Sequence, residues 1–263
     1  MSESDEARLQ LGGMALQNGL AVFGPTAWAA TVRLADGTLK TAHGRRPKAH
    51  AAINRVPLMR GAIRLGEMVV VLPILRRRLP EARLGFEQAG VAAMAGVCSA
   101  ATAVLKRRGG VRGELAATAL GVVPAVLALR SSSLTGYHGA EHKAIGAYEQ
   151  GIEATAATKE HDRCGTHLVG PMMASQLGAA ALISRLPRSY RAPAQAVGQI
   201  AAMGLAVELF AWTDRNRDHA VAKVLGRPGT AFQRAVATTE PSADELEVAE
   251  TALAALLAAE RGT

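Results

Sequence analysis

Aromatic residues are scarce in this sequence and make up only 3 % of its 263 positions. This argues against a core built on large rings. The hydrophobic share is nevertheless 49 %, carried mostly by alanine, leucine and valine, and it favours helices that pack closely through small side chains. Helices in lipid associate in the same way. Composition therefore leaves both a soluble helical bundle and a membrane helical domain open.

Cysteine is equally rare, with two in the whole chain. Cys98 lies in an apolar run and Cys164 lies among histidines, so no disulfide framework is indicated and a reducing compartment is expected. The chain starts with an acidic segment, residues 1–6, and no basic region precedes the first apolar stretch. We therefore expect no cleaved signal peptide.

Acidic residues are outnumbered, which gives a formal net charge of +8 and a pI of about 10.1. Such a balance predicts an anionic partner, either nucleic acid or the headgroups of anionic lipid. The sequence has no glycine-rich phosphate loop, no zinc-finger spacing and few aromatic rings on which bases could stack. Membrane lipid is therefore the favoured partner, and DNA is not expected.

The N-terminal part, residues 1–50, reads as a small β-rich module. Two strand-like runs, 28–34 and 38–41, flank Asp36-Gly37, which is a hairpin signal because glycine accepts the positive φ of a tight turn. A basic loop is expected at 43–48. Residues 51–87 follow as an amphipathic or interfacial helix, because arginines flank its apolar core and Pro73 lies inside it.

Four uncharged stretches predict a mostly α fold with about four alanine-rich membrane helices in a domain spanning residues 88–214. The stretches are 88–105, 115–129, 168–184 and 192–207. Each is near the lower limit of about 17–25 residues for a spanning helix, so buried helices of a soluble bundle remain an alternative. Residues 215–263 form a C-terminal tail. Its amphipathic helix starts at a capping box of Ser242 and Glu245 and is expected to pack on the N-terminal module.

Membrane topology follows from the number of crossings. With four crossings, the polar connection at 131–167 and both termini share one side of the membrane. The larger soluble mass lies on that side, so we expect a multi-pass protein of a bacterial inner (plasma) membrane with both termini in the cytoplasm. The positive-inside rule does not decide the orientation, because both sides carry arginines.

The segment Tyr137-His138-Gly139-Ala140-Glu141-His142-Lys143 has the spacing of a metal site. On a helix, His138 and His142 share a face at i and i+4. Two ring nitrogens can then converge on one Zn²⁺, or on another divalent metal, while Glu141 remains to take a proton from water. The order His-x-x-Glu-His is that of the inverted zincins. A polar surface turn is the alternative reading.

Further candidate ligands lie downstream. His161, Cys164 and His167 are close in sequence, and Glu208 interrupts the last apolar stretch, where an unpaired carboxylate is costly. A catalytic zinc site needs three protein ligands, and the third can come from Cys164, Glu208 or His161. Glu208 can equally be a charge at a helix end that reaches the membrane interface.

Several separated segments together resemble the YqhQ family of bacterial membrane proteins, a family of unknown function often labelled a predicted metal-dependent enzyme. They are Gly12-Gly13-Met14-Ala15 with Gly19 and Gly24-Pro25, then 137–143 with Tyr148-Glu149, then 161–166, Glu208 and 238–241. The resemblance implies an integral membrane protein with a cytoplasmic polar face. It says little about a reaction, because the family's label rests on the same residues.

Two functions follow from these residues. The first is a membrane-embedded metal-dependent hydrolase, with zinc on His138, His142 and a third ligand and with Glu141 as general base. The second is a non-catalytic scaffold or a membrane-protein biogenesis factor whose basic face binds a ribosome, a translocon or anionic lipid. The number of ligands distinguishes them, because a closed four-ligand site favours a structural role.

Overall fold

The computed structural model describes residues 8–47, 60–108, 110–130 and 133–262. The first residues of the predicted N-terminal module (1–7) and the beginning of the predicted interfacial segment (51–59) lie outside these ranges.

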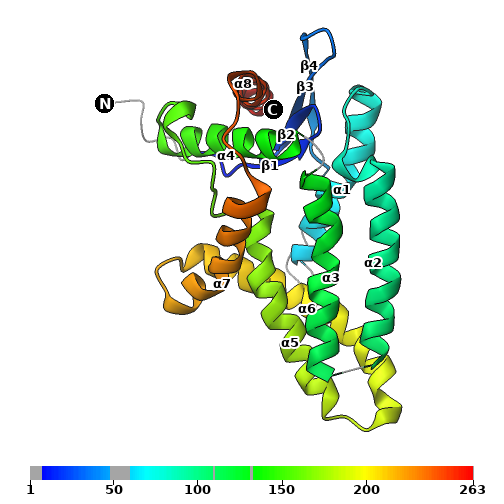
Figure 1. Cartoon of the computed structure of the whole chain (residues 1–263). Coiled ribbons are helices and arrows are strands. Elements are labelled where there is room, and N and C mark those ends of the chain that lie inside the picture. The colour runs from blue at the N-terminus through cyan, green and yellow to red at the C-terminus, as the bar shows by residue number, and fades with distance from the viewer. Residues whose placement is uncertain (1–7, 48–59, 109, 131–132, 263) are drawn as a thin grey trace.

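Four short strands near the N-terminus form one antiparallel sheet in the order β1-β2-β3-β4 (Figure 1). They are β1 (Gly12–Leu16), β2 (Gly19–Phe23), β3 (Ala27–Arg33) and β4 (Leu39–Arg45). Gly37 lies between β3 and β4 with a φ of 87°, and the hairpin predicted there is confirmed. β4 also includes the start of the expected basic loop, because Ala29 pairs with His43 and Ala27 with Arg45.

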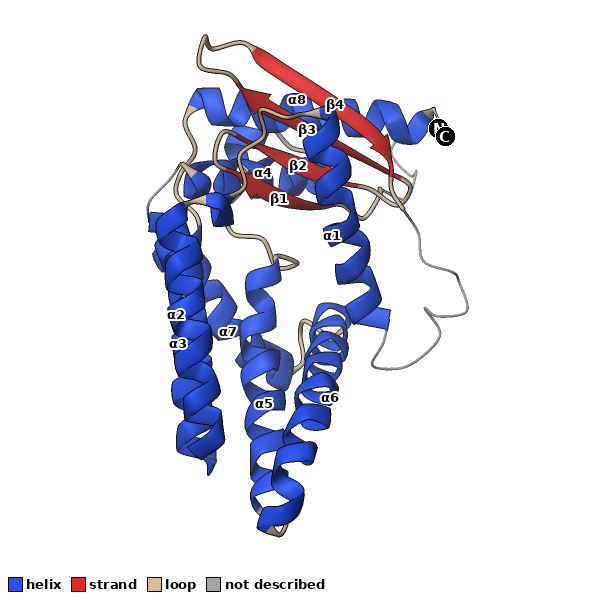
Figure 2. Cartoon of the chain, turned by 90° about the vertical axis from the view of Figure 1, so that its right-hand side faces the viewer, coloured by secondary structure: helices blue, strands red, loops and turns tan. Residues whose placement is uncertain are grey.

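The sheet is covered on both faces, and its two cores follow the period-2 alternation of β3. Ala27 and Ala29 face one core, which is completed by residues of α4 (Leu134–Gln150) and α8 (Ala243–Arg261). Trp28 and Ala30 face the other core, against α1 (Arg60–Arg78). Figure 2 shows α1 on one side of the strands and α8 with α4 on the other. The predicted packing of the C-terminal helix on the N-terminal module is confirmed.

The remaining helices extend away from the sheet. They are α2 (Ala89–Arg108), α3 (Gly110–Arg130), α5 (Val169–Ser184), α6 (Arg188–Arg215) and α7 (Ala220–Phe232). α2 packs along α3, α5 packs along α6, and α3 also contacts α5 (Figures 1 and 2). The four uncharged stretches of the sequence lie in α2, α3, α5 and α6, so a mostly helical fold with a small sheet is confirmed.

Length and composition support a membrane span for fewer helices than expected. Among the described residues, α6 is the one helix that is both long and apolar enough to cross a membrane. The apolar part of α2 is shorter, from Ala89 to Leu105. Alanine, glycine and threonine dilute the other helices, and this is why the expectation of about four crossings is not established by hydropathy.

The connection between α3 and α5 is partly helical rather than a continuous loop. α4 occupies its first half and is held by the sheet and α8, which bury Tyr137, Ala140 and Ala144. Short helical turns follow, η3 (Ala154–Ala156) and η4 (Gly165–Leu168), and a π-helical turn, η5 (Gln233–Ala237), follows α7. Ser242 and Glu245 form the predicted capping box at the start of α8.

Candidate metal centre

Helix α4 carries the His-x-x-Glu-His segment and sets the positions of its side chains. It ends at Gly151, whose φ of 70° is the left-handed conformation common after a helix. The helix is buried along most of its length, and the predicted i, i+4 relation brings the rings of His138 and His142 together, with centroids 4.4 Å apart. Two imidazoles are therefore placed side by side at the junction of the sheet and the long helices.

A backbone carbonyl fixes the tautomer of His138. Its Nδ1–H donates to the carbonyl oxygen of Ala237 at 2.9 Å, and a carbonyl can only accept. The proton is therefore on Nδ1, and the lone pair of Nε2 accepts a hydrogen bond from the Sγ–H of Cys164 at 3.3 Å. Such an outer hydrogen bond is the usual way in which a protein orients a histidine that binds a metal.

His142 is held in the same way from another segment. Its Nδ1–H donates to the carbonyl oxygen of Lys159 at 2.6 Å. Its Nε2 is buried, and within the described part of the chain no group forms a hydrogen bond with it. Burial, and secondarily the neighbouring His138, lowers the pKa of His142 to about 3, so the ring is neutral at physiological pH. A neutral ring with a buried, unsatisfied lone pair is suited to a metal ion.

Cys164 completes the group at the turn that begins η4. The ligand atoms of His138, His142 and Cys164 all lie within 4.8 Å of one another. Nitrogen and sulfur ligands bound to one tetrahedral Zn²⁺ lie roughly 3.5 Å apart, which follows from bond lengths of about 2.1 and 2.3 Å. The 3.3 Å between His138 Nε2 and Cys164 Sγ matches that spacing. Burial raises the pKa of the Cys164 thiol, so this sulfur needs a cation nearby to ionise at neutral pH.

Glu141 points from α4 towards strand β1 and is almost fully buried. A side chain at Gly13 would collide with it, because a Cβ there would be 2.4 Å from Oε1 of Glu141. Burial raises the pKa of Glu141 to about 8, the neighbouring His138 acts in the opposite direction, and Cys164 adds to the shift. The carboxyl group is thus close enough to two of the three candidate ligands to interact with them electrostatically.

The other two predicted ligands lie outside the group of three. His161 donates its Nε2–H to Glu149 at 3.2 Å, and its ring centroid is 5.7 Å from that of His142. Glu149 also forms an ion pair with Arg163, so it anchors the segment that leads to Cys164. Glu208 belongs to α6, and its carboxylate is not among the ligand atoms that converge.

Gln233 is a central residue of the site that the sequence does not indicate. It is fully buried in η5, its Oε1 accepts from the backbone N–H of His161, and its Nε2 donates to Nδ1 of His167 at 3.0 Å. The Nε2–H of His167 then donates to Oγ1 of Thr230 at 3.1 Å. Gln233 and His167 thus hold the Cys164 turn against α7. A glutamine in an ordinary polar context carries no signal for such a role.

The fold and the site together define a class of mostly helical protein, in which a small covered sheet holds a His/His/Cys group at one end of long helices. Residues 131–259 match the family described as "Protein of unknown function (DUF1385)". The chain is also 30 % identical over 118 residues to "Uncharacterized protein YqhQ" of Bacillus subtilis (strain 168). These matches support a YqhQ-like family of unknown function, as the motifs predicted, whereas the membrane and enzyme parts of that resemblance stay predictions.

The extent of that likeness is limited. The aligned region covers 43 % of this chain and 37 % of the Bacillus protein, so this chain spans well under two thirds of that relative. No solved structure matches the chain. The matched family region contains His138, His142 and Cys164 but does not include the sheet.

Proposed function

We propose that this chain is a membrane-embedded zinc-dependent hydrolase whose site lies at the polar end of its helices. The observation that carries the proposal is the convergence of three donor atoms, from His138, His142 and Cys164, within 4.8 Å. Both histidines present Nε2 because carbonyl oxygens hold their Nδ1–H groups, and Nε2 of His142 has no other partner among the described residues. Three ligands leave one position of a tetrahedral site open, which is typical of catalytic rather than structural zinc.

A zinc ion held by these residues would supply Lewis-acid activation of water for hydrolysis. The role of Glu141 is to accept and return the proton. In its buried place it holds that proton until the pH reaches about 8, and the pKa would fall towards the ordinary range with a dication nearby. A pKa near the working pH suits a general base, which must both take up and release the proton.

The exposed apolar surface supports a membrane setting. Several of the large hydrophobic side chains that are more than half exposed lie on the long helices: Val97 and Val104 on α2, Leu182 on α5, and Val197 and Ile200 on α6. Ile200 is 78 % exposed, and most of the apolar part of α6 is not buried against the protein. Lipid would cover this surface, whereas water would be a poor solvent for it.

The same packing supports an orientation in the membrane. Strand β1 and helix α8 belong to the same end of the molecule as the His/His/Cys group (Figure 2). The described parts of both chain ends and the site therefore lie on one side of the long helices. We place that side in the cytoplasm of a bacterial inner membrane, as in the sequence-based expectation.

Bound metal is the first test. The wild-type protein, purified in mild detergent without chelator, should contain about one zinc ion per chain by elemental analysis. His138→Ala, His142→Ala and Cys164→Ala should each lose it, while His161→Ala, Glu208→Ala and Glu141→Gln should keep it. His43→Ala, at an exposed histidine of β4, is the matched control. Absence of stoichiometric metal, or loss of it in the His43 control, would contradict the proposal.

Catalysis needs a second readout. In lipid nanodiscs, peptide and ester substrates should be hydrolysed by the wild type, with loss of turnover after chelation and in Glu141→Gln. Glu141→Gln should retain its metal, so the loss reports on the general base rather than on folding. If metal is bound but no substrate of either class is turned over, the scaffold function gains support. A ribosome, a translocon or another membrane protein bound by such a scaffold would then be sought by crosslinking.

A further inference from the structure

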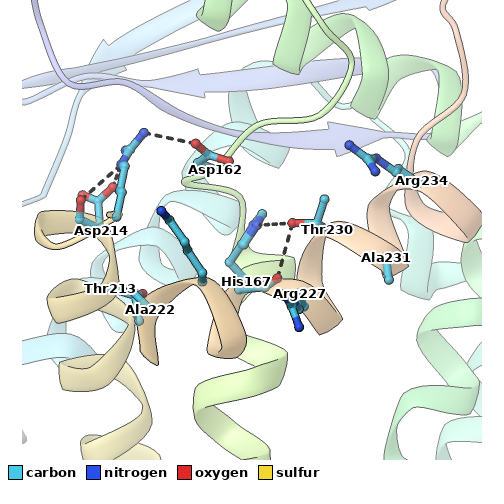
Figure 3. A pocket seen from close by; sticks show the side chains of 12 residues that line it. Asp162, His167, Thr213, Asp214, Ala222, Arg227, Thr230, Ala231 and Arg234 are labelled. Carbon is cyan, nitrogen blue, oxygen red and sulfur yellow. Dashed lines mark hydrogen bonds and ion pairs between the residues drawn. The ribbon is translucent and has the colours of Figure 1, made fainter. Parts of the chain in front are cut away.

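A second feature, separate from the His/His/Cys group, is a cavity of about 610 Å³ between the end of α6 and helix α7. Its wall contains four cationic side chains, Arg217, Lys223, Arg227 and Arg234, and two carboxylates, Asp162 and Asp214. Figure 3 shows the two acids towards one side of the cavity and Arg227 and Arg234 towards the other. None of the three candidate metal ligands lines it.

Both carboxylates of the cavity are held by one arginine. Arg217 forms ion pairs with Asp162 at 3.2 Å and with Asp214 at 2.5 Å. The remaining three cations have weak partners or none: Lys223 lies 3.9 Å from the exposed Asp218, and Arg234 lies 3.5 Å from Glu160. No ion pair of Arg227 occurs among the residues that the structure describes. The part of the wall formed by α7 is therefore positive.

Helix periodicity explains why these cations share one wall. Lys223, Arg227 and Thr230 follow one another at i, i+4 and i+7, and Arg234 comes one turn later in η5. Thr230 and Thr213 also line the cavity, but their hydroxyls donate to the carbonyl oxygens of Gly226 and Phe210. His167, which accepts from Gln233 and donates to Thr230, is a neutral lining residue. Guanidinium and ammonium donors around one concave space are the groups that bind a phosphate.

The surroundings suggest where such a phosphate would be found. α7 begins shortly after α6, the helix long and apolar enough to cross a membrane. Val221 and Val224, on α7 beside the cationic residues, are 50 % and 58 % exposed. The cavity is thus at the level where the apolar helix α6 ends. Lipid headgroups occupy that level of a membrane.

We propose that this cavity is a binding site for a phosphate ester, supplied either by an anionic phospholipid headgroup or by a soluble phosphorylated compound. The phosphate lies against Lys223 and Arg227, and the volume leaves room for the group esterified to it. The site does not depend on a metal at His138, His142 and Cys164.

Two binding measurements test the proposal and separate the two sources. In the first, glycerol 3-phosphate is titrated calorimetrically into protein held in zwitterionic nanodiscs. In the second, protein is isolated from membranes containing phosphatidylglycerol, and the co-isolated lipid per chain is measured by mass spectrometry. Saturable binding in the first identifies a soluble phosphate ester as the ligand. Retention of phosphatidylglycerol over phosphatidylcholine in the second, without binding in the first, identifies the lipid headgroup.

Charge variants provide the control. Arg227→Gln and Lys223→Gln should each weaken binding roughly tenfold, as expected for loss of one charged donor. Arg215→Gln removes the same charge from the exposed end of α6, outside the cavity, and should leave binding unchanged. No binding in either measurement, or an equal effect of Arg215→Gln, would overturn the proposal. The metal content of the same preparations shows independently whether the zinc proposal stands.

Discussion

The ring of His142 donates its Nδ1–H to the carbonyl oxygen of Lys159 at 2.6 Å, and this bond decides which nitrogen faces the other candidate ligands. His138 is fixed in the same tautomer by Ala237. Two segments distant in sequence therefore fix the orientation of both rings. This arrangement has consequences for stability that can be measured without knowing the substrate.

The first prediction concerns the stability of the folded chain at acid pH. Burial lowers the pKa of His142 to about 3, against 6.5 for an ordinary histidine. Between these two pH values, His142 is protonated in the unfolded chain but stays neutral in the folded chain. The stability that depends on this group is fully present above pH 6.5 and is lost as the pH falls towards 3, by about 1.4 kcal/mol for each pH unit. His142→Asn should remove this part of the slope.

The measurement is the free energy of unfolding of chelator-treated protein from pH 7 to pH 4, in wild type and His142→Asn. Only the difference between the two slopes matters, because other histidines and carboxyls contribute equally to both. His43→Gln, at an exposed site, should follow the wild type. Parallel slopes for wild type and His142→Asn would show that the ring is not held neutral.

The second prediction concerns Glu141, whose contribution to stability should fall as the pH rises. Burial raises its pKa to about 8, from an ordinary value of 4.5. The folded chain therefore keeps a proton that the unfolded chain releases. Its contribution is fully present below pH 4.5 and is lost as the pH rises to about 8, again by about 1.4 kcal/mol per pH unit. Glu141→Gln, which cannot ionise, should be the more stable protein at pH 8.

Unfolding of wild type and Glu141→Gln between pH 5 and pH 8, without metal, tests this expectation. The gap between the two proteins should widen steadily with pH. Zinc added at saturating concentration should narrow it, since a nearby dication favours the ionised carboxylate. A constant gap over this range would mean that Glu141 is already ionised at pH 5.

Much of the fold could be predicted from local patterns. The Asp36-Gly37 turn and the Ser242/Glu245 capping box are short-range signals, because the residues that make each turn or cap are close in sequence. For β1 and β2 the sequence predicts only strand-like character. The spacing of His138 and His142 brings their rings together only if the segment is helical, and packing against the sheet stabilises α4 as a helix.

The residue types of the candidate site could be predicted, but not which of these residues lie close together. His138 and His142 followed from helical spacing, whereas Cys164, His161 and Glu208 were equal candidates for a third ligand. The choice depends on where the 161–168 turn packs, and that is set by Gln233, 66 residues away from His167 in the chain. The cationic cavity was not predicted at all. Its cations are close in sequence, but the cavity that they line forms only where α7 packs against the end of α6.

The third prediction concerns Gly139, the glycine inside the His-x-x-Glu-His segment. A Cβ at Gly139 would lie 2.2 Å from the carbonyl oxygen of Thr239, whose backbone N–H is itself bonded to the carbonyl oxygen of Thr135 at 3.1 Å. Neither the backbone of α4 nor that of residue 239 can shift without weakening hydrogen bonds. Gly139→Ala should therefore lower the free energy of unfolding by about 2–3 kcal/mol.

Gly146 on the same helix is the matched control. A Cβ there would meet only side-chain atoms, at 3.5 Å and beyond, which is ordinary contact. Gly146→Ala should raise stability by about 0.5–1 kcal/mol, since alanine favours the helix. Thermal or chemical unfolding in detergent compares the two variants. Equal effects of both substitutions would contradict the close approach of residue 239 to α4.

The last prediction concerns the contact that joins the two ends of the described chain. Glu260, near the end of α8, accepts hydrogen bonds from the backbone N–H groups of Thr26 and Ala27, both at 2.8 Å, and from the hydroxyl of Thr26 at 2.5 Å. The backbone donors lie at the turn into β3 and are shielded from water by this carboxylate. Glu260→Ala would leave them without a partner, and we expect a loss of about 2–3 kcal/mol.

Glu250 provides the comparison, because it is exposed on the same helix. Glu250→Ala removes the same charge and the same number of atoms, and it should change stability by no more than about 0.5 kcal/mol. α8 covers the sheet face that also contacts α4, so weaker packing of α8 should also loosen the His/His/Cys group on α4. Glu260→Ala should therefore release bound metal to a chelator faster than Glu250→Ala does. Identical release rates would mean that the α4 site holds its geometry without the support of the C-terminal helix.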